Sequence, residues 1–208
     1  MQAMVIIVKD QSLLKMLSVG HKLLVGNCLM IACLLLLSSC AVQAEKSIAQ
    51  KPSLLHAPLK KFHPNMTHMS VLMPGSPSEM KDNSADSRKF SCEDDDACFS
   101  VAEQNIDSYD LHDQKHLQAS LDRSVNQAIS AMHGAPNKIA AVSLAGDRYP
   151  GREAEGTLPT PFGEDGQFRI RIYFDVSRKK MYCIGIIGFS KEVYGPNVAS
   201  FLDSLEVN

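Results

Sequence analysis

The chain has 208 residues, a formal net charge of −2 at neutral pH and 45% hydrophobic residues. This length suits one domain with a hydrophobic core and room for a tether. The weakly acidic charge argues against a nucleic-acid-binding protein, which needs a basic surface.

The N-terminal segment carries a short apolar stretch that ends at a cysteine. Residues 29–37 are uninterrupted apolar residues, and Ser38, Ser39 and Cys40 come directly after them. The run is well short of the ~20 residues that a membrane-spanning helix needs. Small residues before a cysteine are typical of a bacterial lipoprotein signal, in which the peptide is removed and the cysteine takes a diacylglycerol group. The sequence predicts a signal peptide over 1–39, starting at Met1 or Met16, and lipidation of Cys40.

The apolar N-terminal segment has two alternative interpretations. A retained membrane anchor would extend over 23–42, although this stretch contains Asn27. Ordinary signal cleavage before Glu45 would instead release a soluble secreted protein. We expect a lipid anchor in the bacterial cell envelope, on the periplasmic face. Because Ala41, and not an aspartate, comes after the cysteine, the outer membrane is the expected destination, with the bilayer as one partner through acylated Cys40.

Residues 40–64 differ in composition from residues 65–208. They mix Lys, Gln, Ser, His and Pro with scattered apolar residues and show no sustained period. This pattern predicts a flexible tether, with a root-mean-square reach of roughly 25 Å. Loss of residues 1–39 removes three lysines and one aspartate, so the formal charge becomes −4. The folded domain is expected over 65–208.

The remaining chain shows the periodicities of an α+β domain. Alternating apolar residues predict strands over 69–73, 88–92, 98–103, 139–144, 151–158, 167–175 and 181–189. A helix is predicted over 113–133, with Asp113 as its N-cap and Gly134 just after its end. Its apolar stripe is Leu117, Leu121, Val125, Ile129 and Met132. A shorter helix is expected over 196–205.

Consecutive strands joined by short turns indicate an antiparallel sheet with helices packed on it. The clearest strand is 167–175, where apolar residues alternate with Arg169, Arg171 and Tyr173. Such alternation is typical of a sheet with one face on a core and the other in water. The predicted fold class is therefore α+β, with a curved antiparallel β-sheet flanked by one long helix and a short C-terminal helix.

Three short motifs occur in a characteristic order and spacing. They are MSVLMPGSP at 69–77, YPGRE at 149–153 and FLDSL at 201–205. With these motifs the chain resembles a group of uncharacterised exported bacterial lipoproteins with a PsbP/Mog1-like domain, over about residues 62–208. The resemblance implies a curved antiparallel sheet flanked by helices and a role in binding or assembly. It supplies no catalytic residues and no cofactor.

Cys92 and Cys98 bracket the acidic turn 93–96 of a predicted hairpin. In an oxidising compartment their expected spacing suits a disulfide, which would contribute only ~2–3 kcal/mol because its loop is short. We therefore predict this bridge, and Cys183 as a core thiol. The acidic turn lacks the spaced oxygen ligands and glycine of a calcium loop.

Candidate binding residues fall in two places. Arg152, in the turn motif, is suited to a ligand carboxylate, but such an arginine more often ties a turn to a neighbouring loop, and we favour this structural role. Arg169, Arg171 and Tyr173 are expected on an exposed sheet face. His112 and His116 have helical spacing but lack the other ligands of a zinc motif, so no metal site is predicted.

Recognised hydrolase and phosphate-binding motifs are absent from the sequence. We expect a non-catalytic binding or assembly module that contacts an envelope protein or a small ligand and no nucleic acid. The alternative is a secreted or periplasmic enzyme whose site forms only in three dimensions.

Overall fold

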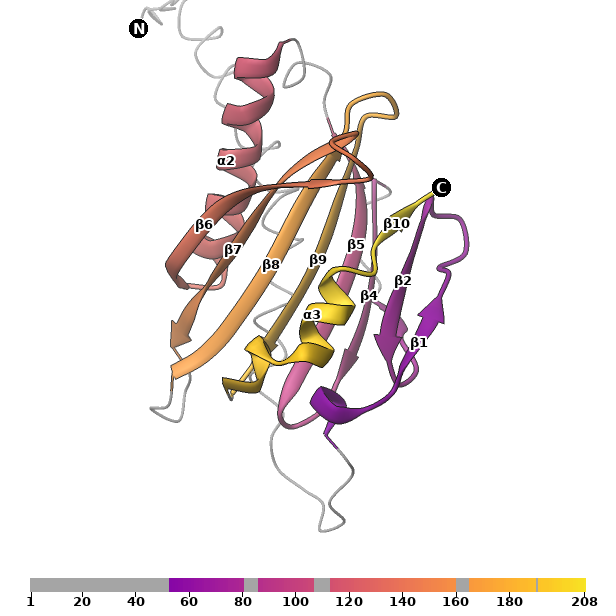
Figure 1. The fold of residues 1–208 in the computed structure, drawn as a ribbon, viewed down its shortest axis with the longest axis vertical. Helices are drawn as coiled ribbons and strands as arrows, with labels where there is room; N and C mark the ends of the chain where they lie inside the picture. Colours follow the sequence, from indigo (N-terminus) through magenta and orange to yellow (C-terminus); the bar gives the residue numbers. More distant parts are fainter. Residues whose placement is uncertain (1–52, 81–85, 107–112, 160–164, 190) are drawn as a thin grey trace, which may run out of the picture.

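The structure is a computed structural model that describes residues 53–80, 86–106, 113–159, 165–189 and 191–208. It contains a seven-stranded antiparallel sheet in the order β3-β4-β5-β9-β8-β7-β6 and a three-stranded sheet in the order β1-β2-β10 (Figure 1). The predicted α+β fold is confirmed. Cys40 and the predicted signal peptide lie outside the described residues. None of the helices within the described ranges is both long and apolar enough to cross a membrane.

The elements are joined by short connections. In chain order they are η2 (Leu54–His56), β1 (Leu59–Phe62), β2 (Met69–Pro74), β3 (Ser78–Met80), β4 (Ser87–Glu93), β5 (Ala97–Asn105), α2 (Gln114–Ala131), β6 (Ala135–Leu144), β7 (Tyr149–Pro159), β8 (Asp165–Asp175), β9 (Lys180–Gly188), η4 (Lys191–Tyr194), α3 (Pro196–Leu202) and β10 (Glu206–Val207).

The long helix α2 forms where the sequence predicts it. Asp113 is its N-cap, and Asp113 Oδ1 accepts the His116 N–H at 2.8 Å. At the other end His133 takes a positive φ of 54°, and the N–H of Gly134 bonds the carbonyl of Ile129 at 2.9 Å. Each end therefore carries a local capping hydrogen bond, of the kind that pairs backbone groups left without a helical partner.

The large sheet is covered on both faces. On the first, here called the α2 face, the apolar side of α2 packs on alternate residues of β7, β8 and β9, among them Phe168, Ile170 and Ile172. On the opposite face, here called the α3 face, the residues in between pack against α3 and β2. Figure 1 shows α3 lying across β9 and β5, with β1 and β2 beside it. Two cores thus share one sheet.

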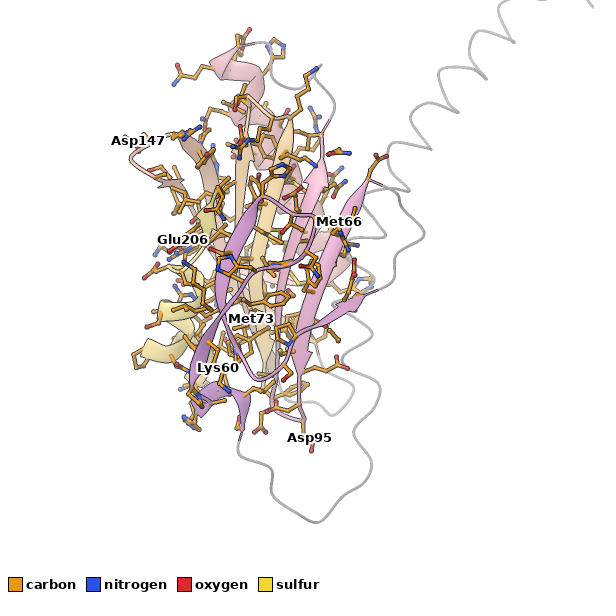
Figure 2. All side chains as sticks on the ribbon, turned by 90° about the vertical axis from the view of Figure 1, so that its right-hand side faces the viewer. Lys60, Met66, Met73, Asp95, Asp147 and Glu206 are labelled. Carbon is orange, nitrogen blue, oxygen red and sulfur yellow. The ribbon has the colours of Figure 1, made fainter. Side chains whose placement is uncertain are left out.

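The start of the folded domain lies earlier than the predicted residue 65. Leu54 and Leu55 are buried, and β1 pairs with β2 in a register that joins Lys60 to Met73; Figure 2 labels both residues. The predicted tether is therefore too long at its C-terminal end, because residues 53–64 belong to the fold. Strand pairing, which a local pattern does not reveal, orders this short segment.

The predicted disulfide between Cys92 and Cys98 is not formed, and both side chains are buried thiols. In the β4–β5 ladder Cys92 lies opposite Phe99, whereas Cys98 lies opposite Glu93. Opposite residues share a face and successive residues alternate. The two thiols therefore point to opposite faces, and two Cys whose Cβ atoms point apart cannot be bridged without moving the backbone.

Candidate functional site

A band of charged side chains occupies the β6–β8 part of the α3 face. Register places Glu153 opposite Arg171, and Glu155 opposite both Arg169 and Lys138. Because opposite residues share a face, all five side chains lie together. Asp203, the C-cap residue of α3, joins them through Arg171. We call these six residues the charged band.

Glu153 is the centre of the band. Its Oε1 accepts a hydrogen bond from Arg169 at 2.8 Å, and its Oε2 accepts one from Arg171 Nε at 3.0 Å. Arg171 also donates to Asp203 Oδ1 at 2.5 Å. This chain of ion pairs connects two strands of the sheet to the end of α3, so the band also fixes where the helix sits.

The band has a sheltered interior and an exposed rim. The side chains of Arg169 and Arg171 are each 13% exposed and that of Glu153 is 17% exposed, whereas Lys138 and Asp203 are each 65% exposed. Burial alone raises the pKa of Glu153, but its bonds to the two arginines outweigh burial and hold the pKa below its ordinary value. Three positive and three negative charges balance across the band. Arg169 and Arg171 are therefore already neutralised by carboxylates of the band and are not available to a small anion.

Tyr194 extends the band toward the β9 end. Its hydroxyl donates to Gln167 Oε1 at 3.1 Å, and the guanidinium of Arg169 lies 5.9 Å from the centre of its ring. Tyr194 remains 41% exposed. An exposed tyrosine beside arginine is the composition that protein interfaces favour.

Tyr173 does not lie on an exposed face as predicted. It is 2% exposed and belongs to the core beneath α3. Arg169 and Arg171, predicted with it as solvent-facing, are sheltered by the ion pairs of the band. The alternation in β8 predicts a water-facing side, but α3 covers this part of the sheet, and the resulting burial raises the pKa of Tyr173.

Arg152 lies on the α2 face, away from the band. Its Nε bonds Asp122 Oδ1 at 2.6 Å and its terminal nitrogen bonds Gln118 Oε1 at 2.6 Å, both on α2. The same side chain reaches the carbonyl of Gly151. Arg152 therefore clamps the helix to β7. Its role is structural, as favoured from the turn motif, but its partner is the helix α2 and not the expected loop.

A second buried polar group lies where β2, β5 and β9 meet. Glu103 is 5% exposed and accepts the His68 N–H at 2.7 Å and the Lys180 ammonium at 3.0 Å. Burial alone raises the pKa of Glu103, but these bonds outweigh it and hold the pKa below its ordinary value. Glu103 is thus a charged structural link. Within the described ranges no group of three or more His, Cys, Asp or Glu is arranged to hold a metal ion, and His112 lies outside them.

Sequence reasoning missed Glu153, Asp203 and Tyr194 as members of the site. Glu153 and Asp203 stand inside the YPGRE and FLDSL motifs. Alternation already places Glu153 on the face opposite to Arg152. The contact between Asp203 and Arg171, 32 residues apart, has no local signal.

Proteins of known structure share this arrangement of sheet and helices. No family model and no curated protein matches the chain. It is similar to the solution structure of cyanobacterial PsbP (CyanoP) from Synechocystis sp. PCC 6803, with 12% identity and a TM-score of 0.53, over 80% of this chain and 99% of that one. It is also similar to the Ran-binding protein Mog1p of Saccharomyces cerevisiae, with 9% identity and a TM-score of 0.45, over 73% of this chain and 96% of that one. The chain therefore has a PsbP-like fold.

Proposed function

We propose that this protein is a non-catalytic binding module that contacts a protein partner through the charged band, and that a lipid on Cys40 tethers it to the periplasmic face of the bacterial outer membrane. The observation that carries the proposal is the band itself: a preorganised, charge-balanced surface with exposed Lys138, Asp203 and Tyr194 at its rim.

The charge balance favours a protein partner over a small anion. A free anion would have to displace Glu153 from two arginines that it already bonds at 2.8 and 3.0 Å. A protein surface of mixed charge can instead pair with the exposed rim and leave the interior intact. Complementary charges of this kind give specificity and speed of association more than raw affinity.

The buried ionisable groups support a non-catalytic role. A general acid at neutral pH needs a raised carboxyl pKa, yet the pKa values of Glu103 and Glu153 are lowered. A nucleophilic cysteine needs a lowered thiol pKa. Burial, reinforced by the neighbouring Cys98, instead raises the pKa of Cys92 to about 11.

Charge reversal at the rim tests the binding proposal. Asp203→Lys places a positive charge on the band, whereas Asp95→Lys makes the same change in the exposed β4–β5 turn. We expect the first variant to lose the partner that co-purifies with the wild-type protein from its own membranes, and the second to retain it. Equal retention by both variants, with the fold confirmed by circular dichroism, would reject the band as the binding surface.

The tether has its own test, which is the intact mass of the mature protein purified from native membranes. A mass that begins at Cys40 and carries a diacylglyceryl group, and that is lost in Cys40→Ala, supports the anchor. A mass that begins at Glu45 would make the protein soluble and secreted, while leaving the binding proposal to stand on the charge-reversal result.

A further inference from the structure

Strand β6 is the long outer edge of the large sheet. It runs from Ala135 to Leu144, pairs with β7 on one side and ends the strand order on the other. Six of its first seven residues, and Ser143, are exposed. Among the described residues, no strand pairs with its outer edge. A strand of this length with unpaired backbone groups is a template for another strand.

The other edges are shorter than β6, whose own protection, which is Pro136, Lys138 and the β-bulge between them, is confined to its first four residues. The opposite edge of the large sheet, β3, has three residues. The two edges of the small sheet are β10, with two residues, and β1, with four, of which two are lysines. Short and charged edges prevent strand addition. From Ile139 to Leu144, β6 carries no charge and is rich in apolar residues, with Ile139 41% exposed.

We propose that β6 pairs with β6 of a second copy of this chain, antiparallel, about a two-fold axis at Ala141. The axis is perpendicular to the sheet, so the α2 face of one copy continues into the α2 face of the other. Residues that oppose one another across the joint must therefore lie on the same face. With Ala141 opposite itself, Ala140 meets Val142 of the other copy and Lys138 meets Leu144. Small and apolar residues then fill the centre of the joint.

The charges of β6 favour this antiparallel pairing. Lys138 is the one charged residue of the strand, and antiparallel pairing separates the two copies of Lys138 by six residues, or about 20 Å. Each lysine then approaches the far end of the other β6, where Asp147 lies in the turn and accepts a hydrogen bond from Ser143 at 2.5 Å. Figure 2 shows Asp147 at the margin of the domain. Parallel pairing would place the lysines side by side.

Single-cysteine cross-linking of the full chain in native membranes tests the proposal. A cysteine introduced by Ala141→Cys would lie about 4.5–5.5 Å, Cα to Cα, from its copy, which is within disulfide range. Asn137→Cys would lie about 27 Å from its copy. Under mild oxidation we expect Ala141→Cys to form at least about five times more covalent dimer than Asn137→Cys. The wild-type protein shows how much dimer forms through the native cysteines alone.

A second pair of variants separates strand pairing from random collision. Ile139→Lys adds a charge to the edge, whereas Val176→Lys adds it to the β8–β9 turn, and both residues are 41% exposed. Added to Ala141→Cys, the first should abolish the dimer and the second should not. The proposal is overturned if Ala141→Cys gives no dimer, if Asn137→Cys gives as much, or if residue 141 cross-links to a different protein.

Discussion

Substitution of Glu153 by glutamine removes the negative charge that Arg169 and Arg171 share. The glutamine has nearly the same size and keeps one acceptor oxygen, so packing changes little. Each guanidinium group loses the Glu153 charge, while Arg171 keeps Asp203 and Arg169 keeps the more distant Glu155. Exposed ion pairs contribute about 0–1 kcal/mol to stability. Breaking a fully buried pair costs about 3–5 kcal/mol because a charge is left uncompensated.

The three side chains of these two ion pairs lie between these limits, at 13–17% exposed. We therefore expect Glu153→Gln to lower the free energy of unfolding by about 2–3 kcal/mol, which for a domain of this size lowers Tm by about 5–10 °C. The assay is urea unfolding monitored by far-ultraviolet circular dichroism. The m value should not change, because the folded structure is retained.

Glu79→Gln is the matched control. Glu79 Oε1 accepts two hydrogen bonds from Arg88, at 2.9 and 2.6 Å, but the Glu79 side chain is 46% exposed. Its loss should cost less than about 1 kcal/mol. If Glu153→Gln and Glu79→Gln destabilise the protein equally, the sheltered ion pairs of Glu153 do not stabilise the fold more than an exposed pair does.

Three further predictions concern other parts of the structure. Arg152→Ala should lower the free energy of unfolding by about 1–2 kcal/mol, and speed amide exchange in α2, because it removes charged hydrogen bonds to the helix; an unchanged urea midpoint would contradict the clamp. Because the pKa of Cys92 is raised to about 11, alkylation by iodoacetamide at pH 8 should be slow in the folded protein and fast in urea; equal rates would contradict its burial. The lowered pKa of Glu103 means that its contribution to stability is complete above its unfolded-state pKa, roughly 4.3, and is lost as the pH falls through the lower folded-state pKa. Wild-type stability should therefore fall more steeply below about pH 4.5 than that of Glu103→Gln, and parallel slopes would refute this role.

Strongly periodic segments were predictable from the sequence. The helix expected over 113–133 is α2, Gln114–Ala131, and the strand expected over 167–175 lies within β8, Asp165–Asp175. In both, a repeated apolar pattern coincides with a buried face, so local and tertiary preferences agree. Short segments behaved differently. β1 has two exposed lysines between half-buried ends and is held by β2.

The candidate site was predictable only in part, because its contacts join distant segments. Sequence alternation correctly grouped Arg169 and Arg171 on one face of β8. It could not show that Glu153 neutralises both or that α3 covers Tyr173, since these facts depend on register and on the path of the chain. The disulfide prediction failed for a related reason: a shift of one residue in the pairing of β4 with β5 decides which face each cysteine occupies.

Site-specific photo-cross-linking in the native cell is the most direct test of a binding module that acts through the charged band. A photoreactive residue at position 203 reports on the band, and one at position 126, exposed on α2, reports on the opposite side of the sheet. The proposal predicts a discrete cross-linked protein from position 203 and none from position 126. The same cross-linked protein from both positions, or from position 126 alone, would contradict it.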